Sequence, residues 1–208
     1  MRCTMKMKSG RKRELILKAA RQEFLEKGFR GGSLRNIAER VSATTGVIYT
    51  YFRNKDDIFR NLVEPAVNEI QHFLEMEETS FLDVKESGAG IREWFSRYLK
   101  FLIDLIERYP DAMRLLFVKS SGSGFENYRD QLIEIGKNRG RNSFRELERT
   151  EEFRGEEISD FFIHNLVNYV FDISVEIIKN DLPRKDLQQF EAEIRAFLFK
   201  GWNGLVKI

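Results

Sequence analysis

The chain has 208 residues, 42% of them hydrophobic and 33% charged, a composition that supports a packed core and excludes a disordered chain. Its single cysteine, Cys3, excludes an internal disulfide and fits a reducing compartment. The basic start is not followed by the apolar stretch of a secretory signal, and no run reaches the ~18 apolar residues that span a bilayer. We therefore expect a cytoplasmic protein with no membrane partner.

The net charge of +2 hides an uneven distribution. Residues 1–60 hold 15 Lys and Arg against 6 Asp and Glu, whereas residues 61–208 hold 20 against 27. A small basic head on a larger acidic body is expected when only the head meets phosphate groups. A solvated basic surface without a partner explains the charge equally well.

The few breakers and the helical spacing of apolar residues predict an all-α fold. The first helix is expected over 11–27, because Gly28 suits a left-handed C-cap after which Phe29 can fold back. Two short helices are expected next, over 34–41 and 45–51.

Side chains suited to capping mark where these helices begin. Ser33 and Thr44 are good N-caps for the two short helices, and Asn54 can cap a fourth. Pro65 should kink or split that fourth helix. Residues 77–90 are the best candidate for a linker.

The remaining sequence predicts longer helices. Gly136 and Gly140 weaken the expectation of one continuous helix around them. The expected helices are 91–108, 112–118, 125–148, 156–179 and 185–206, with a loop at 120–124.

The two short helices form a helix-turn-helix candidate. In this motif the second and third helices lock together through small and aliphatic residues, and the third presents short polar side chains to the major groove. Thr44, Thr45 and Thr50 supply short polar groups, and Gly46 adds no bulk. The residues expected to lock the helices are Ile37, Ala38, Val41, Ala43, Val47 and Ile48.

The stretch SLRNIAERVSATTGVIYTYFRNKDDIF, which begins at Ser33, resembles the DNA-binding signature of the TetR family of bacterial regulators. The resemblance covers residues 11–60, and the rest of the chain is similar in length and helical character. The usual turn Gly-Val-Ser is replaced by Ser42-Ala43-Thr44, and serine tolerates a positive φ less well than glycine. The matching positions are Ser33, Ile37, Ala38, Gly46, Ile48, Tyr49, Tyr51, Phe52, Lys55 and Asp56.

The resemblance implies which residues contact DNA. Ser33 and Thr44 would cap helices whose N-termini point at phosphates, Tyr49 and Lys55 would hold the DNA backbone, and Val47 could touch a thymine methyl group. A basic arm would include Lys12. The predicted DNA-binding set is Arg11, Arg13, Ser33, Arg35, Thr44, Thr45, Val47, Tyr49, Thr50, Tyr51 and Lys55. A structural alternative remains for several of them, since Tyr49 and Tyr51 could be core aromatics and Lys55 a solvated residue.

The resemblance also implies a division into a helix-turn-helix domain, 1–53, and a helical ligand-binding and dimerisation domain, 54–208. Residues 61–208 contain 14 Phe, 2 Trp and 4 Tyr, which make either a packed core or an apolar cavity. Segment 158–178 is apolar on more than one face, so we expect it to be buried on all sides. In this family the last two helices form the dimer interface, which would cover the outer face.

The family's other helices usually surround an inducer pocket, which the composition suggests is mostly apolar. Each candidate lining residue could instead belong to the plain core. The predicted ligand-binding residues are Trp94, Tyr98, Phe101, Met113, Phe117, Tyr128, Phe162, Asn165 and Tyr169.

We therefore expect a dimeric, ligand-responsive transcriptional regulator, a repressor by the majority habit of the family. It would bind an inverted-repeat operator and be released by a small, largely apolar inducer. No enzyme, cofactor or metal site is expected, since His72 and His164 alone do not make a metal site. The alternative is a dimeric small-molecule-binding protein or an enzyme whose head does not bind DNA.

Overall fold

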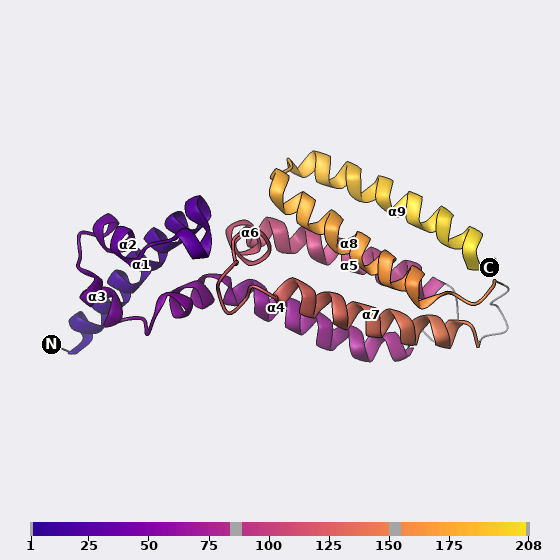
Figure 1. Ribbon diagram of the computed structural model, residues 1–208, viewed down its shortest axis with the longest axis horizontal. Coiled ribbons are helices and arrows are strands. Elements are labelled where there is room, and N and C mark those ends of the chain that lie inside the picture. The colour runs from indigo at the N-terminus through magenta and orange to yellow at the C-terminus, as the bar shows by residue number, and fades with distance from the viewer. Residues whose placement is uncertain (1, 84–88, 150–154, 207–208) are drawn as a thin grey trace. The chain divides into compact units, whose positions relative to one another are not determined.

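The computed structural model describes the backbone of residues 2–83, 89–149 and 155–206, with the side chains of 10–76, 96–146, 148–149, 155–201 and 204. Regular structure within these ranges is α-helical (Figure 1), which confirms the predicted fold class. The helices are α1 (Arg2–Gly31), α2 (Leu34–Arg40), α3 (Thr45–Tyr49), α4 (Lys55–Asp83), α5 (Ala89–Arg108), α6 (Pro110–Val118), α7 (Tyr128–Leu147), α8 (Asp160–Asn180) and α9 (Arg184–Val206).

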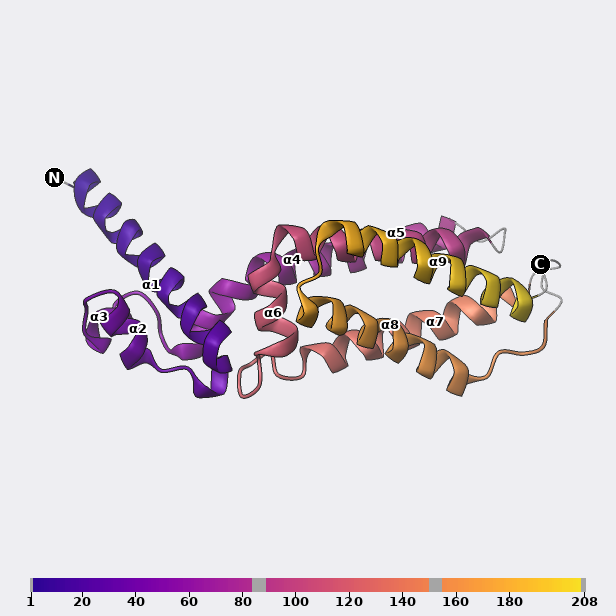
Figure 2. The ribbon, with the colours of Figure 1, turned by 90° about the horizontal axis from the view of Figure 1, so that it is seen from above.

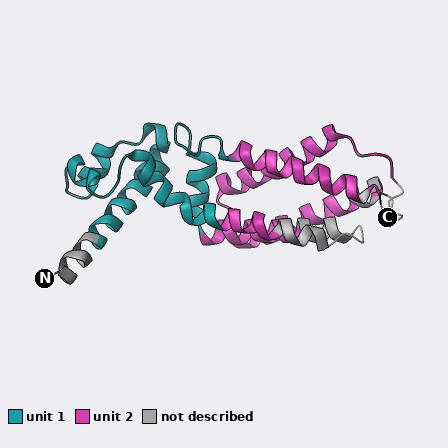
Figure 3. Cartoon of the chain, turned by 90° about the horizontal axis from the view of Figure 1, so that it is seen from below, with its two compact units in different colours: residues 1–68, 109–128 teal, residues 69–108, 129–208 magenta. Residues whose placement is uncertain are grey.

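The helices are grouped into two compact units (Figure 3). Unit 1 comprises residues 1–68 and 109–128, and unit 2 comprises residues 69–108 and 129–208. Helix α6 and the loop that follows it therefore belong to the same unit as the helix-turn-helix candidate. A domain boundary after residue 53 stays a prediction.

Three aromatic rings form the centre of unit 1. The ring centroids of Phe24, Phe29 and Phe59 lie 5.2 to 5.8 Å apart, and all three side chains are buried. Gly28, with φ of 71°, interrupts the regular geometry of α1 and turns Phe29 back onto Phe24, as predicted. Burial of each ring contributes about 1.5–3 kcal/mol to folding.

Hydrogen bonds attach the segment after α6 to the rest of unit 1. The N–H of Phe29 donates to the carbonyl oxygen of Lys119 at 2.8 Å, and the N–H of Gly124 donates to Oδ1 of Asp56 at 2.8 Å. The ring of Phe125 lies 6.3 Å from that of Phe59. The loop is therefore part of the packing of unit 1.

Helices α1 and α4 are longer than the sequence suggested. Helix α1 begins at Arg2, because the residues before 11 include no proline and add further helical turns. Helix α4 continues through Pro65 without splitting, since buried residues on both sides, such as Val63 and Ala66, hold the helix in place.

The predicted linker over 77–90 is wrong for residues 77–83, which belong to α4, and for 89–90, which begin α5. Residues 84–88 lie outside the described backbone. The glutamates in this segment favour a helix, and their polarity alone suggested a linker.

In unit 2, helices α5, α8 and α9 share a core, and α8 and α9 run in opposite directions (Figures 1 and 2). Leu99 of α5 and Ile194 of α9 are buried at its centre. The side chains packed against this pair are Tyr98, Val170, Ile173, Phe190, Leu198 and Phe199.

Helix α7 remains continuous through its two glycines because they are where α8 packs closely. A Cβ atom on Gly136 would lie 3.0 Å from Cγ1 of Val167, and one on Gly140 would lie 3.2 Å from Cγ2 of Ile163. Helix α8 begins four residues later than predicted, where the hydroxyl of Ser159 accepts a hydrogen bond from the N–H of Phe162 at 3.1 Å.

Candidate nucleic-acid interface

Helices α2 and α3 of unit 1 form a helix-turn-helix. Ile37, Ala38 and Ile48 are buried between the helices, and the N–H of Ala43 donates to the carbonyl of Ala38 at 2.9 Å across the turn. Ser42 has φ of 48°, so serine adopts the positive φ for which the family uses glycine. The turn is therefore intact with a different residue.

The outer face of α3 presents short polar side chains and one aromatic ring. Thr44, Thr45 and Thr50 are exposed, and Tyr49 is 56% exposed. Gly46 leaves the backbone open between them. This surface has the size and chemistry of a recognition helix that enters a major groove.

Not every predicted α3 contact is equally accessible. Val47 and Tyr51 are half-buried, so each keeps part of its side chain at the surface and part in the core. The Thr50 hydroxyl donates to the carbonyl oxygen of Val47 at 2.7 Å, which leaves its lone pairs free to accept a hydrogen bond. Phe52 is buried, so it is a core aromatic.

Ser33 and Thr44 occupy the predicted N-cap positions, but the prediction that their hydroxyls cap α2 and α3 is wrong. In the described residues neither side chain accepts a capping hydrogen bond. At α2 a carboxylate from α1 takes the place of the hydroxyl. At α3 the carbonyl of Thr44 accepts from the N–H of Val47 at 3.0 Å, while its side chain stays exposed.

The basic residues of the predicted set differ in how they are held. Arg11 is exposed, and the side chain of Arg35 is 83% exposed and paired with Glu39 at 2.9 Å. Arg13 hydrogen-bonds the Asn61 side chain and lies 5.1 Å from the ring centroid of Phe52. These anchored cations are pre-positioned on the surface of unit 1.

Lys55 has a structural role that neither sequence alternative described. Its ammonium group donates to the carbonyl oxygen of Gly32 at 3.2 Å and lies 4.4 Å from the ring centroid of Phe29. Both contacts hold the start of α4 against the turn between α1 and α2. An ammonium has three donors, so this arrangement still leaves donors for a phosphate. Lys12 similarly donates to the carbonyl of Val41 at 2.9 Å.

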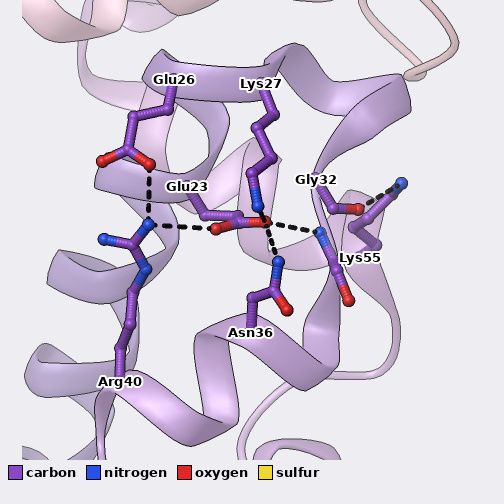
Figure 4. Close-up of polar contacts among 8 residues, drawn as sticks. Glu23, Glu26, Lys27, Gly32, Asn36, Arg40 and Lys55 are labelled. Carbon is purple, nitrogen blue, oxygen red and sulfur yellow. Dashed lines mark hydrogen bonds and ion pairs between the residues drawn. The ribbon is translucent and has the colours of Figure 1, made fainter.

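Sequence reasoning missed Glu23, the acceptor at the centre of unit 1's polar contacts (Figure 4). Its Oε1 accepts from Lys27 Nζ at 3.0 Å, the Ser33 N–H at 3.2 Å and Asn36 Nδ2 at 2.8 Å, and its Oε2 accepts from Arg40 Nη2 at 3.3 Å. The signal was present, because Glu23 is an acidic residue seven positions after buried Ile16, on the apolar face of α1.

The Glu23 carboxyl is held ionised. Burial opposes its ionisation, but the hydrogen bonds from Asn36, Lys27 and the Ser33 N–H outweigh the burial and lower its pKa below the ordinary value. Arg40 also pairs with Glu26 at 2.7 Å. The charges of Lys27 and Arg40 therefore balance those of the two glutamates.

The predicted ligand-binding residues fall in different parts of the molecule. Met113, Phe117 and Tyr128 belong to unit 1, and the other six belong to unit 2. The side chain of Trp94 lies outside the described residues. Whether the nine share one site stays a prediction.

Two of the unit 2 candidates contact the ring of Phe73, and all three rings are half-buried. Phe101 stacks on Phe73 with ring centroids 4.1 Å apart, and Tyr98 lies 6.4 Å from the same ring. The Tyr98 hydroxyl lies 3.3 Å from Oγ of Ser174, which is buried and donates to the Val170 carbonyl. Burial raises the pKa of Tyr98, so its hydroxyl stays protonated.

In the single chain one face of helix α8 is exposed, so its burial on all sides by a second copy stays a prediction. Phe161 is 77% exposed, Phe162 and Tyr169 are also exposed, and on α9 Phe197 is 66% exposed. Asn165 is exposed as well, with its amide bonded to the carbonyl of Phe161. Helix α8 packs on α7 and within the α5–α9 core, and these contacts leave its third face uncovered.

By length and composition alone, α8 is apolar enough to cross a membrane, although the sequence analysis found no such run. A polar residue recurs at every fourth position of the helix, which would be costly in hydrocarbon. This stripe indicates that α8 meets protein and water. It consists of Asp160, His164, Asn168, Asp172 and Glu176.

Comparison with known proteins relates part of the chain to a family. Residues 16–62 match the profile of the bacterial regulatory proteins of the tetR family. This match covers the helix-turn-helix and parts of the helices on either side of it. Over 121 residues the chain is 27% identical to NicS, an HTH-type transcriptional repressor of Pseudomonas putida, and the match covers 58% of this chain and 54% of NicS. The chain spans about half the length of the curated relatives it matches.

Solved structures of two bacterial regulatory proteins have the same fold. NalD of Pseudomonas aeruginosa, described as the secondary repressor of the MexAB-OprM multidrug efflux pump, aligns with a TM-score of 0.62 and 19% identity over 93% of this chain and 97% of NalD. FadR of Bacillus subtilis, solved with stearoyl-CoA, aligns with a TM-score of 0.56 and 18% identity over 89% of this chain and 96% of FadR. At these identities the comparisons show that the chain shares the fold of these regulators.

Proposed function

We propose that the protein is a dimeric transcriptional repressor that binds an inverted-repeat DNA operator through α2 and α3 and responds to a small, largely apolar molecule. The observation that carries this proposal is the outer face of α3, where Thr45, Tyr49 and Thr50 are exposed beside an open glycine backbone. The excess of basic residues over 1–60 supplies the attraction to phosphate. A regulator of this kind acts in the cytoplasm.

The proposed contacts divide into two classes. Thr45, Val47 and Thr50 would meet base edges and set sequence preference, whereas Tyr49 and Lys55 would meet the DNA backbone and set affinity. Further backbone contacts would come from Arg11, Arg13, Ser33, Arg35, Thr44 and Tyr51. A phosphate contact changes the salt dependence of binding, and a base contact changes specificity, so the two classes can be separated.

The direct test is selection of DNA from a random-sequence pool by the purified full-length chain, followed by titration of the enriched DNA at several salt concentrations. We expect saturable binding with a steep salt dependence and an inverted repeat in the enriched sequence. Tyr49→Ala should weaken binding about tenfold, since it removes one anchored contact.

Two matched variants interpret that result. Tyr49→Phe keeps the ring and removes the hydroxyl, and Lys179→Ala removes an exposed cation from α8 of unit 2. We expect the first to bind more weakly than the wild type and the second to bind equally well. If the pool yields no enriched sequence, the alternative of a small-molecule-binding protein or enzyme with a non-functional head takes the place of this proposal.

The exposed rings of α8 and α9 support dimerisation through the last two helices. Isolated apolar side chains are common on surfaces, but four large exposed rings on two adjacent helices favour an interface. Phe197→Glu should convert a dimer to a monomer in sedimentation velocity. Lys185→Glu, at an exposed cation in the first turn of α9, is the control that should leave the dimer intact. A wild-type chain that sediments as a monomer would refute this part.

The half-buried rings around Tyr98 and the hydroxyl of Ser174 support an effector site in unit 2. Two hydroxyls beside aromatic rings suit a ligand with a long apolar part and one hydrogen-bonding group. The fold neighbour FadR was solved with stearoyl-CoA, so an acyl-CoA is a rational first probe. Stearoyl-CoA should release the chain from its DNA, and Ser174→Ala should raise the concentration required. Ser143→Ala, a hydroxyl on α7, is the control.

A further inference from the structure

Among the described residues, Glu23 is the one charged residue that is buried, and none of its side chain is exposed. An ionised carboxylate is costly to bury unless charges and hydrogen bonds compensate it. Here Lys27 and Arg40 supply opposite charge, and the Ser33 N–H and the Asn36 amide complete the set of described donors. A carboxylate satisfied in this way fixes the direction of each donor.

Lys27 belongs to α1, and the other three donors come from the two ends of α2. Ser33 is the N-cap, Asn36 lies in the first turn, and Arg40 is the last residue of the helix. Figure 4 shows Glu23 reaching from α1 toward Asn36 on one side and Arg40 on the other. Two anchored ends prevent α2 from rotating about its axis or sliding along α1.

Helix α2 depends on this anchoring. It has seven residues, fewer than an isolated helix needs to be stable in water. Neither Ser33 nor another described side chain caps it through a hydroxyl. The Glu23 carboxylate is therefore the group at the start of α2 that accepts hydrogen bonds and favours the positive end of the helix dipole.

Helix α3 in turn depends on α2. It has five residues, and it is held by the turn bond between Ala43 and Ala38 and by burial of Ile48. A change in the placement of α2 on α1 therefore changes where Thr45 and Tyr49 face.

We infer that Glu23 is a positioning residue for DNA recognition: its buried carboxylate clamps both ends of α2 to α1 and thereby fixes the orientation of α3. This inference rests on the proposed function, since the orientation of α3 matters to a DNA-binding head. An apolar residue of similar size could fill the same space but would leave α2 free to shift, because only the carboxylate makes directional bonds to four donors.

The test uses the full-length chain and the DNA sequence that it selects. Glu23→Gln keeps one oxygen acceptor but turns an amide donor toward the guanidinium of Arg40, so one end of α2 is released. We expect the affinity for the selected DNA to fall about tenfold and the slope of log Kd against log salt to decrease by about one phosphate contact. Binding is measured where circular dichroism shows each variant fully folded.

The dependence of log Kd on log salt distinguishes a displaced α3 from a chain that is partly unfolded. A variant that merely unfolds in part binds with fewer competent molecules, which weakens Kd but leaves the salt slope unchanged. A displaced α3 loses phosphate contacts, which lowers the slope. Glu26→Gln is the matched control, because it removes the exposed partner of Arg40 and leaves Glu23 intact. It should change Kd by less than about twofold.

Amide spectra and a second variant complete the test. In a ¹⁵N–¹H spectrum without DNA, Glu23→Gln should shift the Ser33 backbone amide and the Asn36 side-chain amide, whereas Glu26→Gln should shift neither. If Glu23→Gln does not fold, Arg40→Lys replaces it, and the same loss of affinity and slope is expected.

Three outcomes distinguish the possibilities. Unchanged Kd and slope in a folded Glu23→Gln chain would overturn the positioning role, and so would a weaker Kd with an unchanged slope. A wild-type chain that selects no DNA would overturn the proposed function, and the inference with it, whatever the variants do.

Discussion

The two units of the molecule expose different kinds of side chain to solvent. Unit 1 buries its first four phenylalanine rings, Phe24, Phe29, Phe52 and Phe59, and around α3 it exposes short polar side chains, basic side chains and the hydroxyl-bearing ring of Tyr49. Unit 2 leaves several aromatic rings of α8 and α9 exposed. Polar and cationic surfaces suit nucleic acid, and apolar surfaces suit protein. The difference indicates that each unit has its own kind of partner.

The same substitution at one phenylalanine of each unit should separate these roles most clearly. Phe24→Ala removes a fully buried ring of unit 1 and should lower the free energy of unfolding by about 3–5 kcal/mol. Phe161→Ala removes a ring that is 77% exposed and should change it by about 0.5 kcal/mol or less in dilute, monomeric chain.

Urea unfolding followed by circular dichroism measures both variants, and sedimentation measures their association. Phe161→Ala should weaken the dimer although the monomer keeps its stability. Equal losses of stability for both variants in dilute solution would show that the α8 ring is buried within the single chain, and the contrast between the units would fail.

A second substitution tests how tightly unit 1 is packed. A Cβ atom at Gly32 would lie 2.5 Å from Cδ1 of Phe24 and 3.1 Å from the carbonyl oxygen of Gly28. Gly32→Ala should therefore destabilise the chain by about 1–3 kcal/mol. Gly201→Ala in α9 meets nothing within 4 Å and should stabilise its helix by up to about 1 kcal/mol. Thermal unfolding of both variants gives the comparison, and a neutral Gly32→Ala would contradict this packing.

A third variant concerns a buried hydroxyl. In the described part of the chain the Tyr128 hydroxyl has no hydrogen-bond partner, and burial raises the pKa of Tyr128 to about 12. Tyr128→Phe should raise the free energy of unfolding by about 1 kcal/mol, because it removes an unpaired polar group. Tyr169→Phe, on the exposed face of α8, should have no effect.

The pH dependence of Tyr128 has a definite sign. Its folded pKa lies above the unfolded value of about 10, so the folded state favours the protonated hydroxyl. This contribution to stability is complete below pH ~10 and is lost as the pH rises through the folded pKa. Urea unfolding at neutral and alkaline pH should therefore show a loss in the wild type that is smaller in Tyr128→Phe. Destabilisation by Tyr128→Phe at neutral pH would mean that the hydroxyl has a partner.

Features that depend on neighbouring residues were predictable from the sequence. Gly28 turns Phe29 onto α1, and the Asn54 side chain accepts from the N–H of Asp57 at 2.8 Å. Each is decided within a few residues of chain. The continuity of α4 through Pro65 was not predictable, because packing by residues on both sides outweighs the local preference.

The candidate DNA-binding site also combines features that the sequence predicts with features that only tertiary packing creates. The exposed row of α3 follows from helical spacing and from resemblance to a family. The role of Glu23 does not, because its partners Ser33, Asn36 and Arg40 come from another helix and meet it through tertiary packing. Lys55 is similar, since its contact with the Gly32 carbonyl joins residues 23 positions apart.

Two substitutions with the smallest expected effect on stability test most directly which unit binds DNA. Arg35 pairs with Glu39 in unit 1 at 2.9 Å, and Arg184 pairs with Glu107 in unit 2 at 3.2 Å. Both arginine side chains are more than 70% exposed, and such surface pairs contribute about 0–1 kcal/mol. Arg35→Ala and Arg184→Ala should therefore unfold at nearly the same urea concentration as the wild type.

Their binding to DNA should differ although their stabilities agree. Arg35→Ala should weaken binding and lower the salt slope by about one, the amount for one lost phosphate contact, while Arg184→Ala should leave both unchanged. Because the two variants remove the same charge from equally exposed positions, net charge cannot explain a difference between them. If both weakened binding equally, the general basicity of the chain would account for its affinity, and the assignment of the DNA surface to unit 1 would have to be abandoned.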